Sequence, residues 1–333
     1  MFAALQSWFG PLAIILTLAS MLSAQADDTP PLVPEATIVL PHTSGRIDHL
    51  AIDLARKHLF VAELGNGSVD VVDLAARQVV HRLTGLREPQ GVLYAPSADR
   101  LAVASAGDGT LRLFSADTFA VLGIIGLGDD ADNLRLAPDG HDVVVGYGDG
   151  GLAVIDPAQR TMRRRIVLPA HPESFQVTQD NRAFINVPDA RRIEVADLNT
   201  GKIVATWSFP GLSGNFPMAL GEDGILAVVF RTPSAFVRID RTSGHEVSRS
   251  RACDDADDVL FDSRRQRYYV SCGAEAVDTF DVTGGRIKAL ASVQTAGGAR
   301  TSLFVPELDR LFVAERAGLF GSDASIRVMR PMP

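Results

Sequence analysis

The stretch HLAIDLARKHLFVAELGNGSVDVVDLAARQVVHRL, residues 49–83, decides the fold. Apolar and polar residues alternate in two runs, 50–52 and 59–61, and a polar turn separates them. Alternation with a period of two residues on either side of a turn predicts a β-hairpin. A third run at 69–73 and a fourth at 79–83 follow after further turns. The stretch therefore predicts four short antiparallel strands.

The same pattern recurs along the chain at intervals of 42, 42, 41, 43, 41 and 43 residues. A fixed period near 42 residues with four strands per unit indicates the blades of a β-propeller. Helical repeats of similar period need apolar residues three and four positions apart, a spacing that the sequence lacks. We therefore predict an all-β, seven-bladed β-propeller. The equivalent apolar positions are Ile52, Tyr94, Leu136, Val177, Leu220, Phe261 and Phe304.

The two ends of the repeat array predict how the ring closes. The last repeat stops soon after its third strand, at 326–329, so it lacks a fourth. A spare strand, Ile38-Val39-Leu40-Pro41, precedes the first repeat and has the same sequence as Ile166-Val167-Leu168-Pro169, the outer strand of the third repeat. We expect the N-terminal strand to complete the last blade, which covers an edge that would otherwise be exposed. The propeller then spans residues 35–331.

The first 26 residues contain no Asp, Glu, Lys or Arg and include an apolar run at 11–22. Ala24-Gln25-Ala26 is a small-residue cleavage signal, so residues 1–26 are expected to be a signal peptide. An uncleaved membrane anchor is the alternative. Residues 27–34 form a Pro-rich leader. We expect a periplasmic or secreted protein that has no membrane contact after cleavage.

Two further features of the sequence bear on compartment and partners. The net charge of −8, with no basic stretch, argues against nucleic acid as a partner. Cys253 and Cys272 flank the first hairpin of the sixth repeat, where antiparallel pairing brings their ends together. In an oxidising compartment such a pair is expected to form a disulfide.

Candidate site residues gather where first strands begin and second strands end, because these segments share one end of a propeller channel. Ligands generally bind at such concave ends. Candidates for catalysis are His49, His171 and Arg300; for ligand binding, Arg46, Asp48, Gln90, Glu173 and Asn215; for metal binding, Glu63, Asp132, Asn133, Asn186 and Asp258.

Two acidic motifs, 129–133 (DDADN) and 254–258 (DDADD), occupy the same blade position three repeats apart. Clustered carboxylates raise one another's pKa or bind a cation, and Ca²⁺ or Mg²⁺ suits oxygen ligands of this kind. The alternative is that these residues only cap turns and stay solvated. His49 and His171 are each either a general base, a metal ligand or a structural hydrogen-bonding residue. Arg300 either binds an anionic group or pairs with an acidic motif.

The repeat resembles those of bacterial YVTN-type (YncE-like) propellers. The motifs that carry the resemblance are Pro89-Gln90-Gly91-Val92, Ala137-Pro138-Asp139-Gly140, Leu59-Phe60-Val61-Ala62 and Leu152-Ala153-Val154-Ile155-Asp156. The resemblance implies an exported binding or accessory propeller with no assigned reaction, and it implies no catalytic residue.

Two functions are therefore open. The first is a periplasmic binding or scaffold protein whose channel mouth takes a small polar molecule or a periplasmic protein. The second is a metal-dependent hydrolase or lyase, by analogy with propeller lactonases, in which Glu63, Asn133, Asn186 and Asp258 hold the cation. In that case His49 or His171 acts as the base and Arg300 orients an anionic substrate.

Overall fold

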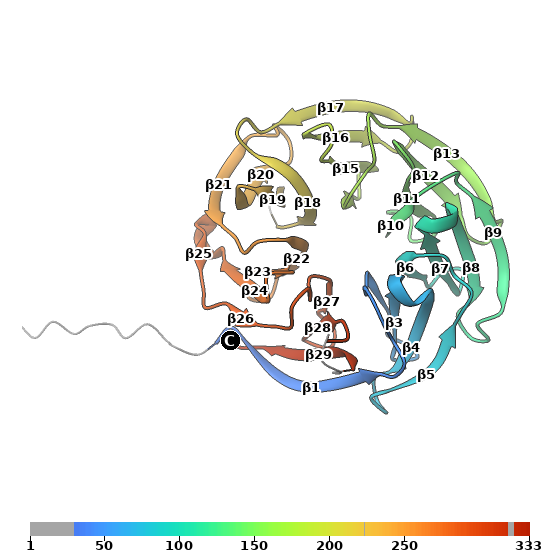
Figure 1. Ribbon diagram of the computed structural model, residues 1–333. Helices are drawn as coiled ribbons and strands as arrows, with labels where there is room; N and C mark the ends of the chain where they lie inside the picture. The colour runs from blue at the N-terminus through green and yellow to red at the C-terminus, as the bar shows by residue number, and fades with distance from the viewer. Residues whose placement is uncertain (1–29, 223, 319–322) are drawn as a thin grey trace, which may run out of the picture.

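The computed structural model describes residues 30–222, 224–318 and 323–333, and the expected signal peptide, 1–26, lies outside them. Seven antiparallel sheets are arranged in a ring, as Figure 1 shows. The predicted seven-bladed propeller is confirmed. From the inner strand outwards, blades one to three are β2 (Leu50–Asp53), β3 (His58–Glu63), β4 (Ser68–Asp73) and β5 (Gln78–Leu83); β6 (Pro89–Ala95), β7 (Arg100–Ser105), β8 (Thr110–Ser115) and β9 (Val121–Gly126); and β10 (Ala131–Leu136), β11 (Val143–Tyr147), β12 (Gly151–Asp156) and β13 (Thr161–Val167).

The remaining blades follow the same order. They are β14 (Phe175–Val177), β15 (Arg182–Val187), β16 (Arg192–Asp197) and β17 (Lys202–Ser208); β18 (Ser213–Leu220), β19 (Ile225–Thr232), β20 (Ser234–Asp240) and β21 (Glu246–Arg251); β22 (Ala256–Asp262), β23 (Arg267–Cys272) and β24 (Ala276–Asp281) with the short β25 (Lys288–Ala289) and β26 (Val293–Gln294); and β27 (Ser302–Val305), β28 (Arg310–Glu315), β29 (Ala324–Pro331) and β1 (Leu32–Leu40).

The N-terminal strand closes the ring as predicted. β1 pairs with β29 in antiparallel register from Leu32 opposite Pro331 to Leu40 opposite Ala324, and Figure 1 shows it at the outer edge of the last blade. Ile38 and Leu40 are buried. The strand begins at Leu32, so the sheet also includes the last residues of the expected Pro-rich leader.

Tight turns between first and second strands contain the Gly, Asp and Asn residues that positive φ angles favour. Between β10 and β11, Gly140 has φ 68°, and Asp139 Oδ1 accepts hydrogen bonds from the backbone N–H groups of His141 and Asp142. Between β14 and β15, Asn181 has φ 59°. These residues set the hairpin register and so decide which side chains begin each first strand.

The hydrophobic core lies between the blades rather than inside any one of them. In the described part of the chain, each apolar cluster combines side chains of two neighbouring blades. The cluster at the closure joins Ile38 and Ile326 of the last blade to Leu59 and Val61 of the first. Blade-to-blade packing therefore continues around the ring and fixes the spacing of the inner strands.

The predicted disulfide is confirmed. Cys253, just before β22, is bonded to Cys272 at the end of β23, with a Cα–Cα distance of 6.0 Å. Disulfides are typical of proteins outside the reducing cytoplasm. Within the described residues, no helix is long and apolar enough to span a membrane.

Candidate functional site

A polar cavity of about 290 Å³ lies where the inner strands begin. Residues from all seven blades or their entry segments contribute to its wall, so the ring itself brings them together. The lining residues are Arg46, Asp48, His49, Gln90, Asp130, Asp132, Asn133, His171, Glu173, Ser174, Phe216, Arg231, Asp257 and Arg300. We call this cavity the mouth.

The inner strands of four blades are irregular at the mouth. The pairing register shifts between Pro89 and Val92 in β6, and between Ala131 and Leu134 in β10. Similar shifts occur in β18, before Met218, and in β22, before Asp258. A bulge turns the side chains of a strand out of strict alternation. In β10 this lets the adjacent residues Asp132 and Asn133 both line the mouth.

Asp132 lies between two histidines. Its Oδ1 is 4.0 Å from Nε2 of His49, and its Oδ2 is 3.9 Å from Nε2 of His171. Both separations are too long for direct hydrogen bonds, so each is a charge interaction. The ring of His171 is held from its other side, because its Nδ1 lies 2.8 Å from the carbonyl oxygen of Gly148 and donates to it. This contact directs Nε2 towards Asp132.

The surrounding carboxylates favour protonated imidazoles. Burial alone would lower the pKa of His171, but Asp132, the Gly148 carbonyl and Asp130 raise it to about 9. Burial is also the largest influence on the pKa of His49 and lowers it, yet Asp48, Asp258 and Asp132 together raise that pKa above its ordinary value. The ring of His171 therefore carries positive charge at neutral pH, and the carboxylates around His49 favour its charged form.

Two carboxyl groups of the mouth hold protons unusually tightly. Burial, reinforced by Asp132 and Asp257, raises the pKa of Asp48 to about 7, although His49 opposes the shift. Burial and Asp132 raise the pKa of Glu173 to about 7. At neutral pH each group is therefore close to half-protonated, and the mouth can supply both acids and bases.

Arginines dominate the opposite side of the mouth. Asp257 is the central carboxylate here: Arg231 Nη2 donates to its Oδ1 at 2.5 Å, and Arg300 Nε lies 2.8 Å from its Oδ2. Arg300 Nη1 also donates to Asp255 at 3.0 Å. The guanidinium of Arg231 stacks over the ring of Phe216, 3.7 Å from its centroid, which orients it by a cation–π contact.

Two buried oxygens at the mouth have no hydrogen-bond donor among the described residues. They are Oδ1 of Asp132 and Oδ1 of Asn133, whose residues are only 5% and 3% exposed. A buried acceptor without a donor costs free energy of about 1–3 kcal/mol. A bound ligand that donates hydrogen bonds, or a cation, would remove this cost.

The structure brings most of the predicted site residues together. The mouth contains the predicted catalytic residues His49, His171 and Arg300. It also contains the predicted ligand-binding or metal-binding residues Arg46, Asp48, Gln90, Glu173, Asp132 and Asn133. Glu63, Asn186, Asn215 and Asp258 do not line it. The structure therefore does not bring Glu63, Asn133, Asn186 and Asp258, the expected cation ligands, together in one cavity.

Glu63 has partners within its own blade. It is fully buried, and it accepts hydrogen bonds from the hydroxyls of Thr43 and Ser68, while Arg82 lies 3.6 Å away. These contacts anchor the entry segment before β2. Its place at the end of a second strand predicts that Glu63 faces the channel. In the structure Glu63 faces the loops of its own blade instead.

Asn186 and Asn215 bind each other and the backbone. The amide of Asn215 donates to Asn186 Oδ1 and to the carbonyl of Arg192, and the amide of Asn186 donates to the carbonyl of Phe216. Their role is to join the fourth blade to the fifth. The N–H groups of both amides are engaged in this junction, and neither side chain lines the mouth.

Asp258 follows Asp257 in β22 and lies deeper in the channel than the mouth. It lines a second cavity of about 320 Å³ farther down the channel, where its Oδ2 accepts the backbone N–H of Ser302. The side chains around it are mostly apolar, and burial raises the pKa of Asp258 to about 6. His49 lines both cavities and separates the mouth from this lower chamber.

Five lining residues of the mouth are not among the sequence-based candidates: Asp130, Ser174, Phe216, Arg231 and Asp257. Asp257 is the true counterpart of Asp132 in the motif of blade six, and a stricter alignment of 129–133 with 254–258 would have identified it. Arg231, near the end of β19, and Phe216 gave no motif signal. Arg135, in the wall of the lower chamber, also went unrecognised; burial lowers its pKa, opposed by Asp258 and Asp132.

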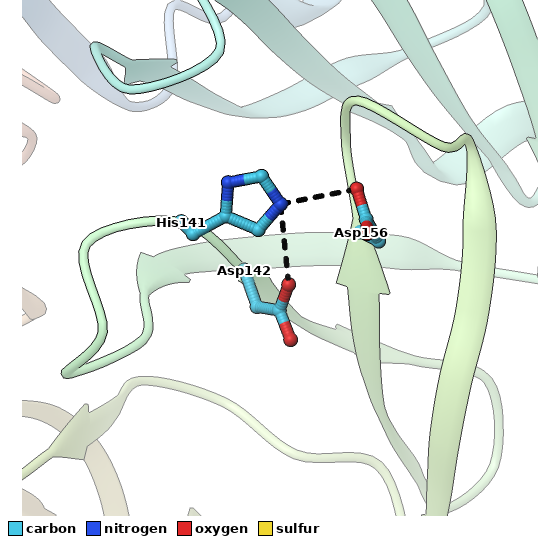
Figure 2. A group of neighbouring side chains, drawn as sticks. All are labelled: His141, Asp142 and Asp156. Carbon is cyan, nitrogen blue, oxygen red and sulfur yellow. Dashed lines mark hydrogen bonds and ion pairs between the residues drawn. The ribbon is translucent and has the colours of Figure 1, made fainter.

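A separate His–Asp cluster lies at the other end of blade three (Figure 2). His141 Nε2 is 3.2 Å from Asp156 Oδ1 and 3.9 Å from Asp142 Oδ1. Asp156 Oδ1 already accepts the backbone N–H groups of Ala158 and Gln159. Arg163 donates to the other oxygen of Asp156. Both oxygens of Asp156 are therefore engaged. Asp142 Oδ1 has no hydrogen-bond donor among the described residues, but Arg163 Nε lies 3.4 Å from it, so we interpret the cluster as a reinforced turn.

Comparisons with known proteins support the fold only. No family model matches the sequence, and no curated protein matches it. The structure is similar to a chain of hydrazine synthase from Kuenenia stuttgartiensis, with a TM-score of 0.74 and 17% identity over 86% of this chain and 97% of that one. At this identity the likeness shows a shared propeller fold and nothing about activity.

Proposed function

We propose that this chain is an exported propeller of the YVTN-repeat (YncE-like) kind that works in the periplasm as a binding protein. Its mouth takes a small polar molecule. The observation that carries the proposal is a polar cavity in which the buried oxygens Asp132 Oδ1 and Asn133 Oδ1 have no donor among the described residues. Buried polar groups are normally satisfied, so acceptors of this kind suit a ligand.

A small molecule suits the mouth better than a protein partner does. The charged side chains Asp48 and Asp132 are nearly fully buried, which places them out of reach of a flat protein surface. A protein ligand would instead need an exposed chain end that enters the cavity. A Cys253–Cys272 disulfide agrees with work in the oxidising periplasm.

A binding screen tests the proposal. The mature chain, residues 27–333, is screened for thermal stabilisation by small polar metabolites, and hits are measured by calorimetry. We expect a ligand whose affinity falls at least about ten-fold in Asp132→Asn. Asp117→Asn, an exposed residue between β8 and β9, is the control and should bind normally. Equal binding by both variants would place the ligand elsewhere.

The second candidate function is a metal-dependent hydrolase or lyase that works in the same mouth. The observation that favours it is Asp132, whose two oxygens face the Nε2 atoms of His49 and His171 across gaps wide enough for another atom. A cation in one of these gaps would be bound by an oxygen of Asp132 and by Nε2 of one histidine. The Gly148 carbonyl would fix the tautomer of His171.

Metal analysis separates the two functions. Protein purified without a chelator is assayed for bound metal, and Ca²⁺ and Mg²⁺ are tested for thermal stabilisation. Stoichiometric metal that is lost in Asp132→Asn supports the enzyme. Metal retained in Asp132→Asn but lost in Asp142→Asn would instead belong to the cluster of Figure 2. Protein without metal and without response to divalent ions supports the binding protein.

A further inference from the structure

A smaller cavity of about 160 Å³ lies beside the mouth. Three guanidinium groups and a single carboxylate line it, and the rest of its wall is backbone or small side chains. Its lining residues are Arg46, Ile47, Asp255, Gly273, Gly298, Arg300, Ala314 and Arg316. We call it the arginine annex. Arg46 and Arg300 line the mouth as well, so these two side chains form the shared wall.

Asp255 is the one carboxylate among the lining residues of the annex, and Arg300 pairs both with it and, at 2.8 Å, with Asp257 of the mouth. Both oxygens of Asp255 accept from Arg300 Nη1, at 3.1 and 3.0 Å. Arg46 pairs with Asp48 at 3.3 Å on the mouth side, while Arg316 donates its Nε–H to the carbonyl of Gly297. Guanidinium groups that converge on one small cavity favour an anionic oxygen group, which they can bind with paired N–H donors.

Two glycines give the annex its shape. A Cβ atom at Gly298 would lie 2.7 Å from Cζ of Arg316, and one at Gly273 would lie 2.1 Å from Oδ2 of Asp255. Both side chains therefore lie flat against glycine backbone. Any larger residue at either position would push a charged group of the annex out of place.

The mouth next to the annex requires hydrogen-bond donors rather than acceptors. Asp132 Oδ1 and Asn133 Oδ1 are buried acceptors without a donor in the described residues, and Asp48, which also lines the mouth, pairs with Arg46 of the annex at 3.3 Å. Hydroxyl or amino groups satisfy such acceptors. The annex therefore suits an anionic group and the mouth suits hydrogen-bond donors, so the two adjoining cavities suit different ends of one ligand.

We propose that the ligand of the mouth is a small anion that also carries hydroxyl or amino groups, with its carboxylate or phosphate in the arginine annex and its donors at Asp132 and Asn133. This inference rests on the proposed binding function and narrows it to a ligand class. Neutral sugars and simple anions each satisfy only half of the site.

The test compares complete probes, which carry both an anionic group and hydroxyl groups, with smaller compounds that carry only one of the two features. Gluconate and glucose 6-phosphate carry both features; glucose carries only donors, and acetate and inorganic phosphate carry only the anion. Calorimetry at low ionic strength, where charge interactions are weakly screened, measures all five. We expect at least one complete probe to bind at least about ten-fold more tightly than either of its halves. Which complete probe binds decides between carboxylate and phosphate.

Variants assign the binding to the annex. Arg316→Ala should weaken the complete probe at least about five-fold, and Arg316→Lys, which keeps the charge, should recover part of the loss. Gly273→Ala should weaken it as well by displacing Asp255 and Arg300. Arg264→Ala, an exposed arginine paired with Asp309 at the far end of blade six, is the control and should bind normally. Circular dichroism and thermal unfolding show that each variant is folded.

Three results would overturn the inference. Glucose binding as tightly as the complete probes would show that no anion is needed, although the mouth would still be a binding site. Arg316→Ala and Gly273→Ala binding like the wild type would remove the annex from recognition, again without touching the proposed function. Failure of every complete probe would reject this ligand class, while the metabolite screen tests the binding function separately.

Discussion

His49 and His171 face opposite oxygens of the same carboxylate, that of Asp132, at 4.0 and 3.9 Å. The two histidines come from different parts of the ring, one before β2 and one before β14. A single aspartate in β10 therefore couples their protonation. This arrangement raises the pKa of both imidazoles, and Asp132 lies buried between them.

The first prediction concerns this coupling. Asp132→Asn removes the charge that favours the imidazolium form, so the pKa of His171 should fall from about 9 by about 1 to 2 units. NMR titration of the histidine ring protons measures it. The ring signals of His245, in the turn between β20 and β21, are the internal control and should be the same in both proteins. A pKa of His171 that stays the same would show that Asp132 does not set it.

The second prediction concerns pH and stability. A carboxyl group whose folded pKa is raised binds its proton more tightly in the folded state, so it loses stabilising effect as the pH rises from 4.5 to about 7. Without ligand, Glu173→Gln should therefore be more stable than the wild type at pH 8, by about 1–3 kcal/mol. Below pH 4 the two should be alike.

Urea unfolding across the pH range measures the difference for Glu173. The control is Glu307→Gln, an exposed residue in the turn between β27 and β28, which should follow the wild-type curve at every pH. If Glu173→Gln were less stable than the wild type at pH 8, the ionised carboxylate would be a stabilising partner and the described electrostatics would be wrong.

The ring closure gives a third prediction. Ile38 is buried between the last blade and the first, whereas its neighbour Val39 is 47% exposed. Ile38→Ala should lower the free energy of unfolding by about 2–4 kcal/mol, because it leaves a cavity in the closure. Val39→Ala should change it by less than about 0.5 kcal/mol. Equal effects in urea unfolding would mean that the closure does not depend on the buried face of β1.

The disulfide gives a fourth prediction. The Cys253–Cys272 bond spans 19 residues. A cross-link over a loop of this length stabilises a protein by about 3 kcal/mol, chiefly by restricting the unfolded chain. The double variant Cys253→Ser, Cys272→Ser should lose about this amount in urea unfolding. Reductant should destabilise the wild type in the same way and leave the double variant unaffected.

Much of the fold could be predicted from the sequence because each level of the repeat carries its own signal. The 42-residue spacing and the alternation in residues 49–83 identify the blades, and the identical tetrapeptides at 38–41 and 166–169 identify β1 as an outer strand. Only local pattern is needed for these inferences. The start of β1 at Leu32 was not predicted, because proline lacks a backbone N–H and a Pro-rich segment does not predict a strand.

The site was only partly predictable, because its membership depends on details that a repeat pattern does not contain. The bulge in β22 changes which of Asp257 and Asp258 faces the mouth, and a shift of one residue in a strand reverses the side-chain direction. Arg231 reaches the mouth from β19, a longer strand than its counterparts in other blades. Glu63 was misassigned because charge alone does not tell whether a residue faces a channel or its own loops.

The binding of a small polar ligand in the mouth is tested most directly by dialysis against a mixture of natural compounds. Mature wild-type protein and the Asp132→Asn and Asp117→Asn variants are each equilibrated with a periplasmic small-molecule extract, and retained compounds are identified by mass spectrometry. The account predicts that a polar compound is enriched by the wild type and by Asp117→Asn but not by folded Asp132→Asn. No enrichment by the wild type, or equal enrichment by all three proteins, would contradict it.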